Sequence, residues 1–187
     1  MAIDYSIYGR YTEATLRGLH FCYQCPAQAF LISATTGGHP TLINPSNSNR
    51  VFIPTRYVCS FVSGTTVIGS VLLAETLNVT LGTGATVPTA TPVAGTPCYR
   101  GGPVGQSVMN WSPTTNTFTV APVVRSATTI NFGAADPTNS GFDHQHLFDG
   151  NFAVYPGNAI SFTYSVTTST ALFISSLYGV ELPMPNF

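Results

Sequence analysis

Two histidines two residues apart form the stretch of this sequence that is best suited to chemistry. They lie in the run DHQH at residues 143–146, and Asp149 follows shortly after them. On a β-strand, residues i and i+2 point to the same face, so His144 and His146 could hold one metal ion with Asp149 as a third ligand. Histidines that only make hydrogen bonds in a loop are the simpler interpretation, and we expect no metal or other cofactor.

The spacing Cys22-x-x-Cys25 suggests half of a zinc site or a redox pair. The other cysteines, Cys59 and Cys98, supply no second pair at that spacing. Cys25 precedes Pro26 in a strand-like run, not at the start of a helix, where a thiolate would be stabilised. We therefore expect free thiols that pack as small hydrophobic groups in a reducing compartment.

Enzymatic chemistry has little else to work with. The sequence has no nucleophile elbow, no phosphate-binding loop and no paired carboxylates, and its Asp and Glu residues number only 7. Trp111, Tyr99 and Tyr155 could line a sugar-binding surface, but aromatic residues in an all-β chain more often form the core. We expect that the protein is not an enzyme.

The elements that would position these residues are predicted to be strands. Residues 160–166 alternate apolar with hydroxyl side chains, and residues 172–182 resume the same period of two after a Thr/Ser turn. This period is typical of half-buried strands. We predict that the two runs form one long antiparallel pair that lies in a larger sheet.

The remaining patterns predict an all-β fold, an antiparallel β-sandwich or jelly roll of eight to ten strands. An extended N-terminal arm, residues 1–20, precedes a single domain at 21–187 and contains one helical turn at 12–19 that Gly18 ends. A turn is predicted at 35–39, where two glycines lie, and one long Thr/Pro/Gly-rich loop at 82–102. Strands are predicted at 50–62, 117–124 and 128–132. Pro54 interrupts the first of these strands, so we expect a sheet edge or a bulge there.

Composition excludes several classes of partner. Charged residues make up 7% of the chain, against about 25% in an ordinary soluble domain, and the 6 cations are scattered arginines. This argues against direct binding of nucleic acid, which requires a clustered basic patch. No apolar run approaches the roughly 20 residues of a membrane helix, and no secretion signal opens the chain, so we expect synthesis in a cytoplasm and no membrane partner.

Several turn-and-strand motifs resemble small all-β virion proteins of tailed bacteriophages, of the capsid decoration or cement type. The resemblance covers about residues 40–70 and 148–183. Its motifs are PTLINP at 40–45, NSNRVFI at 47–53, SGTTVIG at 63–69, PGNAISF at 156–162 and VELP at 180–183.

The resemblance implies a homotrimeric β-sandwich on the outer capsid surface of the virion, which binds the major capsid protein and stabilises the expanded shell. A low-charge, Thr/Ser-rich sheet protein also suits repeated protein contacts on independent grounds. Guided by composition and expected exposure, we assign shell contacts to the N-terminal arm and the long loop, namely Tyr5, Tyr8, Arg10, Tyr11, Arg17, Tyr99 and Arg100.

Three alternatives remain open. A jelly-roll coat protein usually has a basic N-terminal arm, but Arg10 and Arg17 are the only cations in the first 49 residues. A tail or head-fibre adhesin would present loops of the same scaffold to a host glycan. A cupin-like metalloprotein would use the His-x-His pair, but the glutamate expected after it is absent and no histidine follows Pro156-Gly157.

Overall fold

The architecture consists almost entirely of antiparallel strands, as the alternating sequence pattern predicts. The computed structural model describes residues 12–27, 36–38, 41–64, 69–76, 95–98, 107–112, 115–117, 123–130, 143–148, 152–164 and 172–184. These residues contain one short helix, α1 (Thr12–Leu16). Their strands are β1 (His20–Gln24), β2 (Thr36–Gly38), β3 (Thr41–Ile43), β4 (Arg50–Ser63), β5 (Gly69–Thr76), β6 (Thr96–Pro97), β7 (Asn110–Ser112), β8 (Thr115–Thr117), β9 (Val123–Ile130), β10 (Asp143–Leu147), β11 (Ala159–Tyr164) and β12 (Leu172–Pro183).

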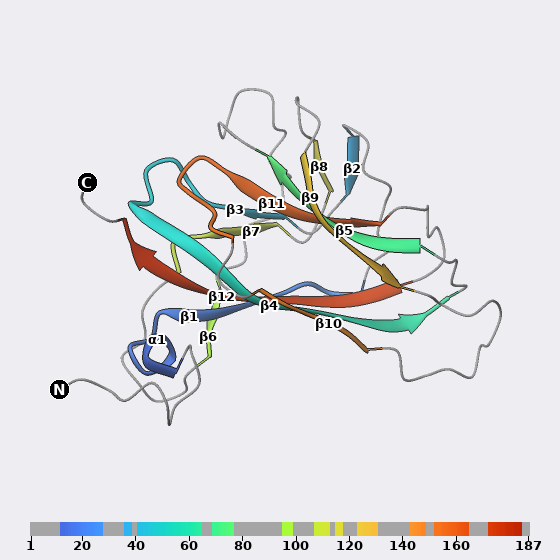
Figure 1. Ribbon diagram of the computed structural model, residues 1–187, viewed down its shortest axis with the longest axis horizontal. Helices are drawn as coiled ribbons and strands as arrows, with labels where there is room; N and C mark the ends of the chain where they lie inside the picture. Colours follow the sequence, from blue (N-terminus) through green and yellow to red (C-terminus); the bar gives the residue numbers. More distant parts are fainter. Residues whose placement is uncertain are drawn as a thin grey trace.

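The strands form two five-stranded sheets and one two-stranded sheet. Sheet A has the order β10-β4-β12-β1-β6, and sheet B has the order β7-β3-β11-β5-β9. Strands β2 and β8 form the third sheet. Sheets A and B lie one above the other as two layers, with α1 beside β1 (Figure 1). Every strand pairing described is antiparallel.

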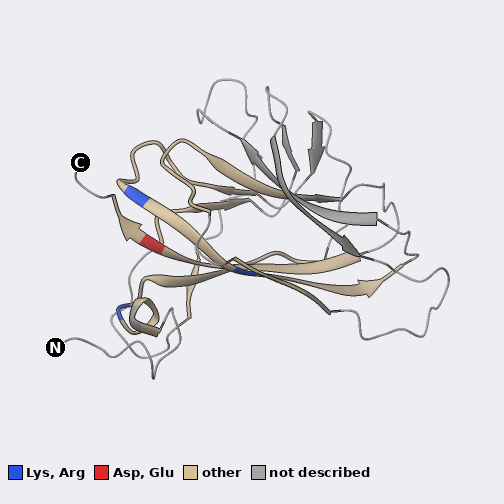
Figure 2. Cartoon of the chain, in the orientation of Figure 1, with Lys and Arg blue, Asp and Glu red and all other residues tan. Residues whose placement is uncertain are grey.

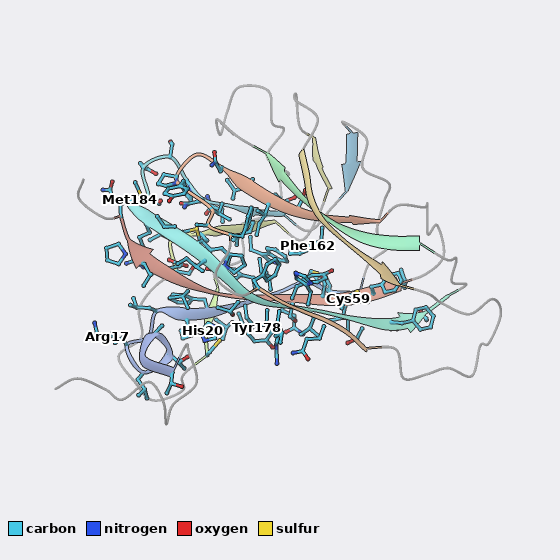
Figure 3. All side chains as sticks on the ribbon, in the orientation of Figure 1. Arg17, His20, Cys59, Phe162, Tyr178 and Met184 are labelled. Atoms are coloured by element: carbon cyan, nitrogen blue, oxygen red, sulfur yellow. The ribbon has the colours of Figure 1, made fainter. Side chains whose placement is uncertain are left out.

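The main core lies between sheets A and B, where large side chains of the two sheets meet. Strands β3 and β11 of sheet B are buried on both faces, since Thr41 to Ile43 and Ala159 to Phe162 are all buried. The Tyr57 ring of sheet A stacks on the Phe162 ring of sheet B, with centroids 3.9 Å apart and planes at 5°. Phe162 points between the layers, whereas Tyr178 projects from the opposite side of sheet A (Figure 3). In strand β12 of sheet A, buried and half-buried residues alternate from Leu172 to Tyr178.

The predicted long pair at the end of the chain is wrong. Strand β11 lies in sheet B between β3 and β5, whereas β12 lies in sheet A between β4 and β1. Both runs are strands, as their period of two predicts. In β12, however, the apolar row of Leu172, Ile174 and Tyr178 is the half-exposed one, and in β11 the residues from Ala159 to Phe162 are all buried. The chain changes sheets between them, so β11 and β12 face each other across the core instead of sharing a hydrogen-bond ladder.

Strand β4 confirms that Pro54 requires an irregularity. It is an interior strand of sheet A, but β10 pairs only with Arg56 to Ser60, so Pro54 lies beyond that ladder and pairs with β12 alone. The ladder to β12 shifts register between Tyr178 and Gly179, where Gly179 lies opposite Pro54 and Thr55 is passed over. A Cβ atom at Gly179 would overlap the Phe52 ring, so this position needs glycine.

Smaller elements differ from expectation in several places. Helix α1 stops at Leu16, and Gly18 adopts φ 69° while its N–H bonds the Thr15 carbonyl at 3.0 Å, so glycine ends the helical turn as predicted. The predicted glycine turn is instead β2, paired with β8. Strand β9 runs unbroken across the gap predicted between 124 and 128. In the described part of the chain, no helix is long and apolar enough to span a membrane.

Candidate functional site

The histidine pair lies on the edge strand β10 and not in a loop. His144 lies opposite Cys59 in the ladder to β4, and His146 lies opposite Tyr57. The His146 ring packs edge-on against Phe148, with centroids 4.6 Å apart and planes at 82°. No group of three His, Cys, Asp or Glu side chains suited to a metal occurs among the described residues, and Asp149 lies outside them. The metal site considered for this pair stays an untested alternative.

The Cys22-x-x-Cys25 motif does not form a paired site, because an odd spacing along an extended chain separates the two side chains. Cys22 lies on the half-exposed outer side of β1, whereas Cys25 is buried toward the core. Cys25 bonds Ser175, with its sulfur 3.3 Å from the Ser175 carbonyl oxygen. Cys59 lies opposite Ser175 on the other side and is also buried, so both residues are buried free thiols, as predicted.

A buried carboxylate, which the sequence did not single out, connects three strands and one loop. Glu181 of β12 is fully buried, and its carboxylate bonds the Arg50 guanidinium at 3.2 Å. The Tyr23 and Ser107 hydroxyls donate to one carboxylate oxygen, and the Val108 N–H donates to the other at 3.0 Å. Burial first, and then the charge of Glu181, raise the pKa of Tyr23, so its hydroxyl remains a donor.

This network is suited to a structural role, because the carboxylate is fully buried and bonds groups from two other strands and a loop. A sequence signal for this network exists but was missed. It is the single acidic residue inside the apolar run Val180-Glu181-Leu182. A charge in that position must be paired when it is buried. Its partner Arg50 lies 131 residues away in the chain, so no local pattern identifies it.

A second polar cluster joins the two stretches of the bacteriophage resemblance. Asn44 is fully buried, and its side-chain amide donates to the carbonyls of Arg50 and Val154, each at 2.8 Å. The Asn44 N–H bonds the Asn158 carbonyl at 2.9 Å, and the Gly157 N–H bonds the Asn44 carbonyl at 2.8 Å. Two motifs more than a hundred residues apart therefore meet at one corner of the fold, where they fix loop geometry.

The aromatic residues considered for sugar binding have different locations. Trp111 is fully buried and its indole N–H bonds the Gln24 carbonyl at 3.1 Å, so it belongs to the core. Tyr155 is 48% exposed, and Tyr99 lies outside the described residues. The structure does not bring Trp111 and Tyr155 together on one surface.

The side of sheet A that faces away from sheet B, here called the outer face, carries a row of half-exposed side chains across four strands. Leu147 lies opposite Arg56, Arg56 opposite Tyr178, and Tyr178 opposite Cys22. The Arg56 guanidinium sits over the Tyr178 ring, 4.5 Å from its centroid. Leu147 is 64% exposed at the end of the row. The next row contains only uncharged side chains, namely Gln145, Val58, Ser176 and Gln24.

Charge is scarce over the whole described surface. The described side chains include four charged ones, of which Arg50 and Glu181 pair with each other (Figure 2). Arg56 is therefore the one charged group among the described side chains of the outer face. Arg17 is exposed just after α1, and the other predicted shell contacts lie outside the described residues, namely Tyr5, Tyr8, Arg10, Tyr11, Tyr99 and Arg100.

Comparison with protein-family models, curated protein sequences and solved structures finds no match for this chain. The all-β architecture and the outer face of sheet A are thus the features of the molecule that bear on its function.

Proposed function

We propose that sheets A and B form a jelly-roll sandwich. Its eight strands in chain order would be β1, β3, β4, β5, β9, β10, β11 and β12. In this numbering the first pairs with the eighth, the second with the seventh, the third with the sixth and the fourth with the fifth. This nested pairing supports the jelly roll, because it arises when a long hairpin winds into two Greek keys.

The proposed fold limits the possible classes of function but does not identify one of them. Jelly rolls occur in viral capsid proteins, lectin domains and cupins, and a fold alone does not define an activity. A cupin-like role would require room between the sheets for a metal and its substrate. In the described part of the chain, stacked and edge-on rings fill that space, since Tyr23 meets Phe52 with centroids 5.6 Å apart and Tyr57 meets Phe162 at 3.9 Å. This packing favours a structural role.

The function that these observations support best is that of a structural virion protein which decorates a bacteriophage head. It would bind the major capsid protein on the outer surface, assemble as a homotrimer and stabilise the expanded shell. The observation that carries this proposal is the outer face of sheet A, where Arg56 lies between Leu147 and Tyr178 and is the one charged group among the described side chains. The cores of protein interfaces typically contain few charged residues, but they are enriched in aromatic residues and arginine. Many copies of a weak contact on one lattice would add through multivalency.

Co-sedimentation with heads that lack this protein tests the proposal, using unexpanded and expanded heads of the phage that encodes it. We expect saturable binding to expanded heads alone, together with a higher rupture temperature, because a clamp that binds one lattice state stabilises that state. Absence of binding to both forms would exclude the decoration role, and glycan binding by the isolated protein would then support the adhesin.

The contribution of the outer face is tested by placing a charge on it. Leu147→Asp adds a carboxylate to an exposed position that contributes little to stability, so it should fold normally and bind expanded heads at least tenfold more weakly, about 1.4 kcal/mol. Asn47→Asp makes a similar change in the exposed loop before β4 and is the matched control. Equal binding by both variants would show that the shell contacts lie elsewhere on the protein.

A further inference from the structure

Two of the four cysteines lie close together at the edge of sheet A that ends in β6. Strand β6 pairs with β1 through only two residues, Phe21 opposite Pro97 and Cys22 opposite Thr96. The Cys98 N–H continues this ladder by bonding the His20 carbonyl at 2.9 Å. Residues opposite each other in an antiparallel ladder point to the same face, so Cys98 lies on the side of His20 and Cys22, diagonally across from Cys22.

The environment of the two thiols places them together on the outer face. Burial first, and the neighbouring Cys22 second, raise the pKa of Cys98 to about 11, while the Arg56 charge opposes this shift. Burial also raises the pKa of Cys22, and its hydrogen bonds with Tyr178 and Ser176 oppose this rise. Both sulfurs are therefore near Arg56, and both side chains are partly accessible to solvent.

We propose that Cys22 and Cys98 form a disulfide site that fastens β6 to β1 under oxidising conditions. Diagonal Cα atoms in such a ladder are about 7–8 Å apart, and a disulfide needs less than about 7 Å. Closure thus requires a movement of about 1 Å, which a residue just beyond a two-residue edge strand can make. This proposal does not depend on the virion role.

The reaction needs an oxidant, for which a small-molecule disulfide such as oxidised glutathione serves. One cysteine thiolate attacks this disulfide, forming a mixed disulfide and releasing one reduced glutathione. The second cysteine thiolate then attacks the protein sulfur of the mixed disulfide, forming the Cys22–Cys98 bond and releasing a second reduced glutathione. The two protons lost by the cysteines end on the two glutathione thiols. The protein pair is oxidised by two electrons as the glutathione disulfide is reduced.

The other cysteines provide an internal comparison. Cys25 and Cys59 flank Ser175 of β12 from opposite sides, so their backbones are separated by two strand spacings, about 9.5 Å. This exceeds the reach of a disulfide. Both are also buried, whereas Cys22 and Cys98 are half-buried. The structure therefore permits one cross-link on the outer face and forbids the corresponding one inside.

The test treats the intact folded protein with oxidised glutathione and counts free thiols under denaturing conditions. We expect the count to fall from four to two, with no retained glutathione. Trypsin cleaves after arginine, giving peptides 18–50 and 57–100, each with one outer-face and one buried cysteine. These peptides should appear as one covalent pair, two hydrogens lighter than their sum. Fragment ions that separate Cys22 from Cys25, and Cys59 from Cys98, locate the bond without any variant.

Variants give an independent assignment. Cys22→Ala and Cys98→Ala should each abolish the cross-link, and the remaining outer-face thiol should retain glutathione. Cys25→Ala should leave the cross-link unchanged and is the matched control. The proposal is overturned if the thiol count stays at four, if both outer-face cysteines of the natural protein retain glutathione, or if the fragment ions place the bond on Cys25 or Cys59.

Discussion

The two faces of sheet A are made by the same strands but differ in burial and in the kinds of contact that their side chains make. On the inner face, large rings interlock with sheet B, and the buried Glu181 carboxylate is held by partners from three other segments. On the outer face, Arg56 rests on Tyr178 and the neighbouring side chains stay partly exposed. Changes to the inner face should thus alter stability, and changes to the outer face should alter binding and reactivity.

The largest expected effect is at the buried carboxylate. Glu181→Ala removes the acceptor shared by Tyr23, Ser107, Val108 and Arg50, and leaves the Tyr23 and Ser107 hydroxyls to bond each other. We expect the free energy of unfolding to fall by about 3–5 kcal/mol, measured by urea denaturation. Glu181→Gln keeps the shape and one acceptor oxygen, so it should cost less, about 1–3 kcal/mol. Equal and small losses for both variants would mean that the network contributes little to stability.

A smaller effect of the opposite sign is expected for Tyr57. Its ring stacks on Phe162, and its buried hydroxyl has no partner that meets hydrogen-bond geometry among the described residues, although Cys59 and Ser175 lie close to it. A buried hydroxyl without a partner costs free energy, so Tyr57→Phe should stabilise the protein by about 1 kcal/mol.

Tyr23→Phe is the control for this prediction, because the same atom is removed from another inner-face tyrosine. The Tyr23 hydroxyl donates to Glu181, so its removal should destabilise the protein by about 1.5–3 kcal/mol. Thermal unfolding of both variants would show the contrast as shifts of Tm in opposite directions. Destabilisation by Tyr57→Phe would contradict the assignment of an unpartnered hydroxyl.

Local patterns located several strands of the fold, because an extended backbone gives its side chains a period of two. The period of two located β4, β11 and β12. It did not show which side is buried, since the apolar row of β12 is half-exposed and the described part of β11 is buried on both sides. Gly18 was correctly predicted as a helix stop because positive φ is a property of one residue. The same patterns carry no information about pairing partners, and for this reason β11 and β12 were wrongly joined.

The candidate site was harder to predict, since it depends on contacts between distant segments. The Cys22-x-x-Cys25 motif suggested a pair, yet strand geometry separates these thiols and brings Cys98 toward Cys22 instead. Glu181 could be recognised as unusual in an apolar strand, but its partners could not. Asn44 belonged to a recognised motif, and only the fold showed that the motif is a structural corner.

The smallest expected effect lies at His20 on the outer face and depends on pH. The His20 ring bonds Thr15 at 2.8 Å and Thr55 at 3.2 Å, which joins α1, β1 and β4. Burial first, and Arg56 second, lower the pKa of His20 below 6.5. The unfolded chain therefore takes up a proton as pH falls through 6.5, while the folded chain resists it, so stability should decrease from pH 7 toward the lower folded pKa and then level off.

Urea denaturation at a series of pH values, compared between the natural protein and His20→Gln, isolates this contribution from that of the other histidines. The difference in unfolding free energy between the two proteins should change with pH over this window. The slope of this change should correspond to less than one proton per molecule. A constant difference would mean that His20 titrates alike in both states. That result would place His20 in a solvated environment, and would weaken the view that the outer face holds its side chains through specific contacts.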